Sequence, residues 1–201
     1  MDVADAFAAA AGAFVALVQR LPDGHWSDPG LGVWDLRALV GHASRSLVTV
    51  DTYLDRPVER ADLTSPEAYF VAAAAMTGAD PAAVAERGRQ AGAALGQDPG
   101  AYVDALAGRV LDRVAAAGDP VIETICGGMR LQCYMPTRTF ELVVHSLDIS
   151  AATGVPSGLS EELLAEAAGL AVRVGVARGQ GTTMLLALTG RNALPSGFSV
   201  L

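Results

Sequence analysis

Glu141 and His145 are the two residues whose types and spacing most directly suggest chemistry, because they lie four positions apart. On an α-helix this spacing puts both side chains on one face, one turn apart. A carboxylate oxygen and an imidazole nitrogen placed in this way can hold one divalent ion, as in the metal sites of helical bundles. Apolar residues flank Glu141, and an unpartnered carboxylate would be costly there. The pair therefore indicates a metal site; the alternative is a surface pair or a buried histidine without metal.

His42 could supply a third ligand from a different helix. It lies midway along a predicted helix over residues 36–54, beside that helix's apolar stripe rather than on its charged side. A third ligand from a facing helix would complete a site with three protein ligands and one open position, which is the arrangement of catalytic zinc.

Three further residues could support such a site. Asp148 follows His145 by three residues and could orient the imidazole as a hydrogen-bond acceptor, or be an ordinary surface acid. Arg138 precedes Glu141 by three residues and could pair with that carboxylate, bind an anionic substrate or form a surface ion pair. Trp34 could line a pocket, although such residues more often anchor a core or a loop.

The remaining histidine and the two cysteines are weaker candidates. His25 lies in a predicted loop, where we expect it at the surface or at a pocket rim. Cys126 and Cys133 are too few for a disulfide framework. They are not expected to face each other on a hairpin, so we predict that they are buried as small hydrophobic residues.

Helices dominate the elements that must position these side chains. Apolar residues recur at three- and four-residue spacing, and capping residues or a capping residue followed by proline precede several of these stretches. The predicted caps are Asp35, Ser160 and the first residues of Ser65-Pro66, Asp80-Pro81 and Asp98-Pro99. The predicted helices span residues 2–20, 36–54, 66–76, 81–95, 99–117, 136–153 and 161–177.

Two segments are predicted as strands instead. Residues 121–125 and 129–133 are β-prone and are joined through Gly127-Gly128, which indicates a hairpin. Residues 182–189 and 197–201 look like two further short strands. The expected fold is mainly α: a helical bundle over residues 1–180, one or two small β-hairpins, and a short β-strand tail over residues 181–201 packed on the bundle.

Composition excludes several classes of protein. Of 201 residues, 51% are hydrophobic and 18% charged, a balance that excludes intrinsic disorder. The 14 basic residues are all arginine, and against 22 acidic residues they leave a net charge of −8, which argues against nucleic-acid binding. No apolar stretch reaches the ~20 residues that a membrane span needs. Because Asp2 and Asp5 stand where an export signal would be basic, we expect a soluble, cytoplasmic protein.

Two blocks of the sequence resemble a known family. Trp34-Asp-Leu-Arg-Ala-Leu-Val-Gly-His42 resembles the W-x-x-x-x-L-x-x-H opening of the mycothiol-dependent maleylpyruvate isomerase family. Arg138-Thr-Phe-Glu141-Leu-Val-Val-His145-Ser-Leu-Asp148 resembles that family's R-x-x-E-x-x-x-H-x-x-D block. The segments around residues 127–129 and 186–195 are also similar.

The resemblance implies a DinB-like four-helix bundle whose three metal ligands fall here on His42, Glu141 and His145. It also implies zinc or another divalent ion, and mycothiol as the low-molecular-weight thiol. In the isomerases proper, a sizeable C-terminal domain follows the bundle and contributes to the active site. Here only residues 178–201 follow the last predicted helix. The expectation is therefore a short form of the family, in which maleylpyruvate isomerisation is not the favoured reaction.

Three functional hypotheses remain open from the sequence. The first is an enzyme in which the metal activates mycothiol for S-transfer, conjugation or isomerisation of a small electrophile. The second is a metal-dependent hydrolase, for which no separate general base is obvious. The third is a non-catalytic metal-binding helical module, which a fourth protein ligand would favour. The expected partners are a small-molecule substrate and the thiol, with no nucleic acid and no membrane, in a monomer or homodimer.

Overall fold

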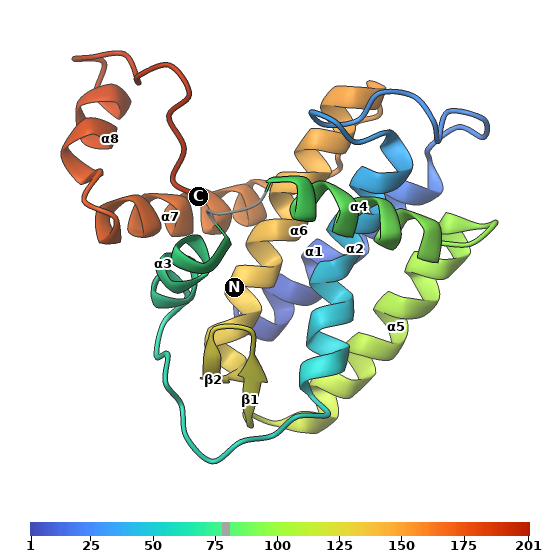
Figure 1. Ribbon diagram of the computed structural model, residues 1–201, viewed down its shortest axis with the longest axis horizontal. Helices are drawn as coiled ribbons and strands as arrows, with labels where there is room; N and C mark the ends of the chain where they lie inside the picture. The colour runs from blue at the N-terminus through green and yellow to red at the C-terminus, as the bar shows by residue number, and fades with distance from the viewer. Residues whose placement is uncertain (78–80) are drawn as a thin grey trace.

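The computed structural model describes residues 1–77 and 81–201, which form a helical protein with one small β-hairpin (Figure 1). In chain order the elements are α1 (Val3–Gln19), α2 (Leu36–Tyr53), α3 (Pro66–Thr77), α4 (Pro81–Ala94), α5 (Pro99–Ala117), β1 (Val121–Thr124), β2 (Gly127–Arg130), α6 (Leu131–Thr153), α7 (Glu161–Ala177) and α8 (Gly181–Leu188). The prediction of a mainly α fold is confirmed.

Four of these helices make the central bundle. Helices α1 and α2 each contact both α5 and α6, so the four surround one common core. Helix α4 lies along α2, α3 contacts α6 and α7, and α8 contacts α7 at the edge of the molecule (Figure 1). Fully buried side chains fill the core from all four bundle helices; they include Phe7, Phe14, Leu39, Leu47, Val103, Val110, Leu131 and Leu142. None of the described helices is long and apolar enough to span a membrane.

Most of the predicted helix caps form. The carboxylate of Asp35 accepts a hydrogen bond from the Ala38 amide at 2.7 Å, and Asp98 caps α5 in the same way. The Ser65 and Ser160 hydroxyls accept from amides three residues on. Such caps satisfy amides that have no partner within the helix. The predicted cap at Asp80 lies outside the described residues.

The predicted hairpin exists, but its turn is not where the sequence placed it. The turn consists of residues 125–126, while Gly127 and Gly128 belong to β2. Gly128 is required by a tertiary contact, because a Cβ there would lie 2.0 Å from the backbone oxygen of Arg60. The two glycines therefore leave room for the neighbouring segment at Arg60 and Asp62 instead of forming the turn.

Helix α6 begins at Leu131, five residues before the predicted start, so Cys133 is helical and not part of a strand. Its first amides are satisfied from outside the helix: that of Leu131 donates to the Pro120 carbonyl, and that of Gln132 donates to the Asp119 carboxylate, each at 2.9 Å. These partners lie upstream of the hairpin, where a local capping pattern does not reveal them.

The prediction of a β-strand tail is wrong. Residues 181–188 form α8, and residues 197–201 are irregular. A short apolar run does not distinguish strand from helix by its periodicity. Here the helical form packs Met184 against α7 at Gly175, where an added Cβ would lie 2.1 Å from the methionine sulfur. The irregular end is held by Arg178 and Gln180, which donate to the carbonyls of Val200 and Ser199.

Candidate metal centre

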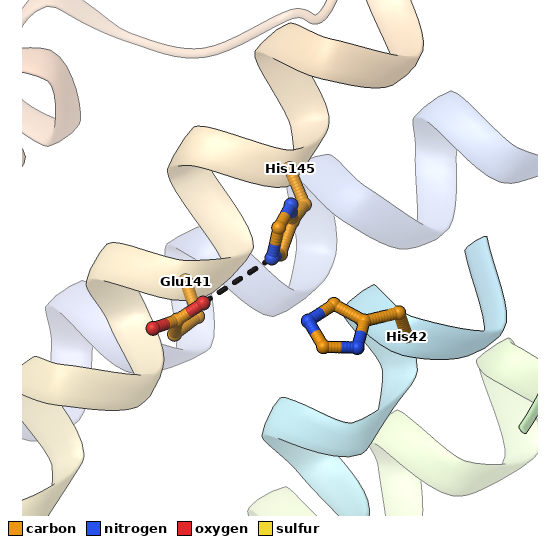
Figure 2. A group of neighbouring side chains, drawn as sticks. All are labelled: His42, Glu141 and His145. Carbon is orange, nitrogen blue, oxygen red and sulfur yellow. Dashed lines mark ion pairs between the residues drawn. The ribbon is translucent and has the colours of Figure 1, made fainter. Parts of the chain in front are cut away.

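Helices α2 and α6 bring the three candidate ligands together. His42 comes from α2, and Glu141 and His145 come from neighbouring turns of α6 (Figure 2). One potential ligand atom from each residue can be chosen so that all three lie within 4.8 Å of one another. The two imidazoles meet edge to face, with ring centroids 4.9 Å apart. The cluster is therefore compact enough for a single ion to contact all three side chains.

Within α6, the four-residue spacing brings the side chains of Glu141 and His145 together, as predicted from the sequence. The Nε2 atom of His145 lies 3.2 Å from Oε2 of Glu141. On the opposite side of the ring, Nδ1 of His145 is 3.0 Å from a carboxylate oxygen of Asp148. A carboxylate that accepts from one ring nitrogen fixes the tautomer and leaves the other nitrogen for a metal. Asp148 is thus placed to orient His145.

The protonation states of the cluster follow from its surroundings. Burial opposes protonation of His145, but the adjacent carboxylates of Asp148 and Glu141 outweigh it and raise the pKa to about 9. For His42, burial and the neighbouring His145 lower the pKa to about 4. Burial opposes ionisation of Glu141, but His145 and Arg138 outweigh it and lower the pKa of that carboxyl. Without a metal, His145 is therefore an imidazolium between two carboxylates, and His42 is neutral.

Two ring nitrogens of the cluster show that its hydrogen bonding is incomplete. Nδ1 of His42 is buried and has no hydrogen-bond partner among the described residues. Nε2 of His145 is also buried, and it makes the 3.2 Å ion pair with Glu141 but no well-formed hydrogen bond. Unpaired polar atoms inside a protein are costly, and they often mark a site that binds something. Two imidazoles and one carboxylate also match the donor set of zinc sites that keep an open position. The residues fit a divalent ion.

A cavity of about 300 Å³ adjoins the cluster. His42 and Glu141 form part of its lining, together with aromatic, apolar and basic side chains. The other described lining residues are Arg45, Ser46, Thr49, Tyr53, Tyr69, Phe70, Ala73, Ala74, Val84, Arg87, Ile125, Arg138 and Leu201. A small molecule in this cavity would lie next to an ion held by the cluster.

Arg138 lines the cavity without an ion-pair partner in the described part of the chain. Its guanidinium carbon stands 5.3 Å from the ring centre of Tyr69 and 5.0 Å from that of Tyr134, and its Nε donates to the Thr137 hydroxyl at 3.0 Å. The tyrosine faces stabilise the cation. They leave its terminal nitrogens free to donate to an anion.

The other residues proposed from the sequence are not members of the three-residue cluster. Trp34 does not line the cavity; it packs against His42, with ring centroids 4.5 Å apart. His25 is exposed and pairs with Asp28 in its loop, outside the cluster. Cys126 and Cys133 are free and only partly buried, and neither belongs to the cluster.

Much of the cavity wall consists of residues that were not predicted from the sequence. Arg45 follows His42 by three residues on α2, so helical spacing could have suggested it. Arg87 on α4 and Tyr69 on α3 carry no such signal, because they reach the cavity only through the packing of separate helices.

Fold and cluster together define a helical bundle with a candidate metal site between two of its helices. The chain matches the family model described as the mycothiol maleylpyruvate isomerase N-terminal domain over residues 7–150. It belongs to that family, and the resemblance inferred from the two sequence blocks is confirmed. The domain is therefore a mycothiol-related, DinB-like metal-binding domain. No curated protein and no solved structure matches the chain.

Proposed function

We propose that this chain is a metal-dependent enzyme that uses a low-molecular-weight thiol, mycothiol, to modify a small electrophile by S-transfer, conjugation or isomerisation. The proposed ligands are His42, Glu141 and His145, and Zn²⁺ is the expected ion. The observation that carries the proposal is the position of this incompletely hydrogen-bonded cluster at the wall of a cavity of about 300 Å³. A purely structural site would be expected to be closed by a fourth protein ligand.

The protein's own thiols support the use of an external one. Burial raises the pKa of both Cys126 and Cys133, so each favours the thiol over the nucleophilic thiolate. A divalent ion in the cluster would lower the pKa of a thiol bound to it and so supply thiolate at neutral pH. The chain's contribution is to hold the ion with three side chains and to leave space beside it for the thiol and the electrophile.

The arginines of the cavity favour an electrophile that carries negative charge. Arg45, Arg87 and Arg138 all line it, and none pairs with a carboxylate of the described residues. Six other arginines form ion pairs with acidic side chains in the described part of this acidic chain. A carboxylate on the substrate would receive charge-assisted hydrogen bonds from Arg138, which would orient its electrophilic carbon.

The hydrolase hypothesis has less support from the cavity. A bound water would need a general base besides the metal ligands. Among the described side chains that line the cavity, that of Glu141 is the sole carboxylate, and it is assigned to the ion.

Matched electrophiles test this proposal. Zn²⁺-loaded protein is incubated with mycothiol and either an α,β-unsaturated carboxylate or its methyl ester, and the adduct is measured by mass spectrometry. Sulfur bonds to the β-carbon, and the thiol proton ends on the α-carbon. We expect the acid to react above background and the rate to be lost in His42→Ala and Glu141→Ala. Replacing Arg138 with Gln should lower the rate of adduct formation with the acid by roughly tenfold or more, as expected when a charged hydrogen bond is lost. The rate with the methyl ester should not change.

A control variant and one contrary result complete the test. Arg56→Gln changes an exposed arginine outside the described cavity lining, so it should leave both rates unchanged. If Cys126→Ser abolished turnover while removal of the metal did not, the chemistry would belong to the protein thiol and the proposed mechanism would be wrong.

A further inference from the structure

The two candidate histidine ligands are supported in different ways. A histidine that binds a metal through one ring nitrogen usually donates its other N–H to a carboxylate, carbonyl or water. His145 follows this rule through Asp148. His42 does not: its Nδ1 is buried and has no hydrogen-bond partner among the described residues. Its ring nevertheless directs a nitrogen toward Glu141 and His145 (Figure 2). Something other than a hydrogen bond must hold the ring in this orientation.

Trp34 is the side chain in position to do so. Its indole lies against the His42 ring, with centroids 4.5 Å apart and planes inclined by 33°. On the candidate metal side, the His42 ring meets the ring of His145 edge to face. Contacts with both aromatic neighbours restrict rotation of the His42 side chain.

Helix α4 holds Trp34 in turn. The indole N–H donates to the backbone oxygen of Ala85 at 2.9 Å. The ring also occupies the space above Gly88, where an added Cβ would lie 2.4 Å from the indole. Close by, α4 touches α2 backbone to backbone, since a Cβ at Gly41 would lie 2.2 Å from the amide nitrogen of Gly92. The indole is therefore fixed by a rigid helix contact and not only by its own loop.

We propose that Trp34, fixed against α4, is a positioning residue that holds His42 in its metal-binding orientation by packing, in place of the usual hydrogen bond. This inference rests on the proposed function only in taking His42 as a ligand. It gives α4, which supplies none of the three ligands, a role in the metal centre: Ala85 and Gly88 define where the indole lies.

Cobalt binding tests the inference without any assay of activity. Co²⁺ is titrated into metal-free protein, and both the Kd and the visible absorption of the bound ion, which reports coordination geometry, are recorded. Trp34→Leu should raise the Kd about tenfold or more, as expected when support of a ligand is lost, and should change the spectrum. Trp34→Phe keeps a ring beside His42 and should lie between Trp34→Leu and the wild type.

Two controls separate positioning from general packing. Trp26→Phe changes the other tryptophan of the chain, which stacks with Arg37, and should leave the Kd and spectrum unchanged. Gly88→Ala is not a control, because it removes the space for the indole; it should raise the Kd and change the spectrum, as the Trp34 variants do. Gly108→Ala, where an added Cβ meets nothing within 4 Å, should have no effect.

The outcomes are distinct. If folded Trp34→Leu has the wild-type Kd and spectrum, Trp34 is only a packing residue and the inference is overturned. If that variant does not fold, unchanged spectra in both Trp34→Phe and Gly88→Ala overturn it instead. If the wild-type protein binds no Co²⁺, both the proposed metal centre and this inference are wrong. If the wild-type protein binds Co²⁺ and the variants bind it equally well, only the proposed role of Trp34 is wrong.

Discussion

Helix α2 makes one set of polar contacts at its C-terminal end and another closer to its middle, and the two sets differ in how completely the polar groups are paired. Toward its C-terminal end, Asp51 accepts hydrogen bonds from Arg113 at 2.7 Å and from Arg109 at 3.1 Å, both on α5. Arg113 also pairs with Asp55. Every charged group in this network has an opposite charge beside it, and the network stands at the surface of the protein.

Closer to its middle, α2 presents His42 to α6, and here the pairing is incomplete. The site is more enclosed, with the side chain of His145 only 11% exposed, yet two of its ring nitrogens make no well-formed hydrogen bond in the described structure. A fully paired network joins two helices and needs nothing more. A buried cluster whose candidate ligand residues are only partly paired gains stability when an ion binds between them. The difference distinguishes a structural contact from a candidate binding site, and four predictions test it.

The largest expected effect is loss of the metal. We predict close to one equivalent of divalent ion per chain, and replacing His145 with Ala should abolish binding because it removes both a ligand and the partner of Glu141. Elemental analysis after purification measures the content. Asp51→Asn, in the paired network, should keep a full equivalent. Retention of metal by the His145 variant would rule out the assignment.

Removal of the ion should also destabilise the fold, because it links α2 to α6. An ion present at about a thousand times its Kd stabilises the native state by ~4 kcal/mol. For a chain of this size, this corresponds to a drop in Tm of about 10 °C when a chelator is added. Thermal melts at equal protein concentration measure it. His145→Ala should show no such drop, whereas an unchanged wild-type Tm would mean that the site contributes little to folding.

Metal affinity should depend on pH in a defined direction. Because the pKa of His145 is about 9 without metal, an ion that binds below this pH must displace a proton from the ring. His42, with a pKa of about 4, is already deprotonated near neutrality. The apparent affinity should therefore rise about tenfold per pH unit between pH 6 and 8, with about one proton released. Calorimetry in buffers of different ionisation enthalpy measures this release; a pH-independent affinity would contradict it.

The smallest effect should come from the paired network. Burial opposes ionisation of Asp51, but hydrogen bonds from Arg113 and Arg109 outweigh it and lower its pKa. Such a carboxylate stabilises the fold above its unfolded pKa of about 4, and this contribution is lost as the pH falls through the lower folded value. Arg113→Gln should lower the Tm at pH 7 by at most a few degrees, since solvent still reaches these partly buried ion pairs and such pairs contribute little. The difference from wild type should shrink in acid, and metal content should not change.

Local sequence was sufficient for the parts of the site that lie within one helix. The spacing of Glu141, His145 and Asp148 fixes their relation, because three or four residues return the chain to the same helical face. Caps such as Asp35 were predicted for the same reason, since a cap and its amide are neighbours in sequence. The family blocks then indicated His42 as the third ligand.

Sequence failed where the determinant was a contact between distant segments. The Gly127-Gly128 pair resembles a turn, but Gly128 is small because Arg60 approaches it. The early start of α6 depends on Asp119. Residues 181–188 are apolar enough for a strand or a helix, and packing on α7 makes them a helix.

The sequence alone therefore determined which residue types stand on each helical face, and with them the Glu141–His145 pair. Only the tertiary structure decided that Trp34 packs against His42 instead of lining the cavity, and that Arg87 from α4 joins Arg138 from α6 at its wall. The physical reason is the distance along the sequence between the residues that determine each feature. Helical geometry repeats every few residues and can be predicted from local spacing, whereas the meeting of two helices depends on how many side chains pack together at once.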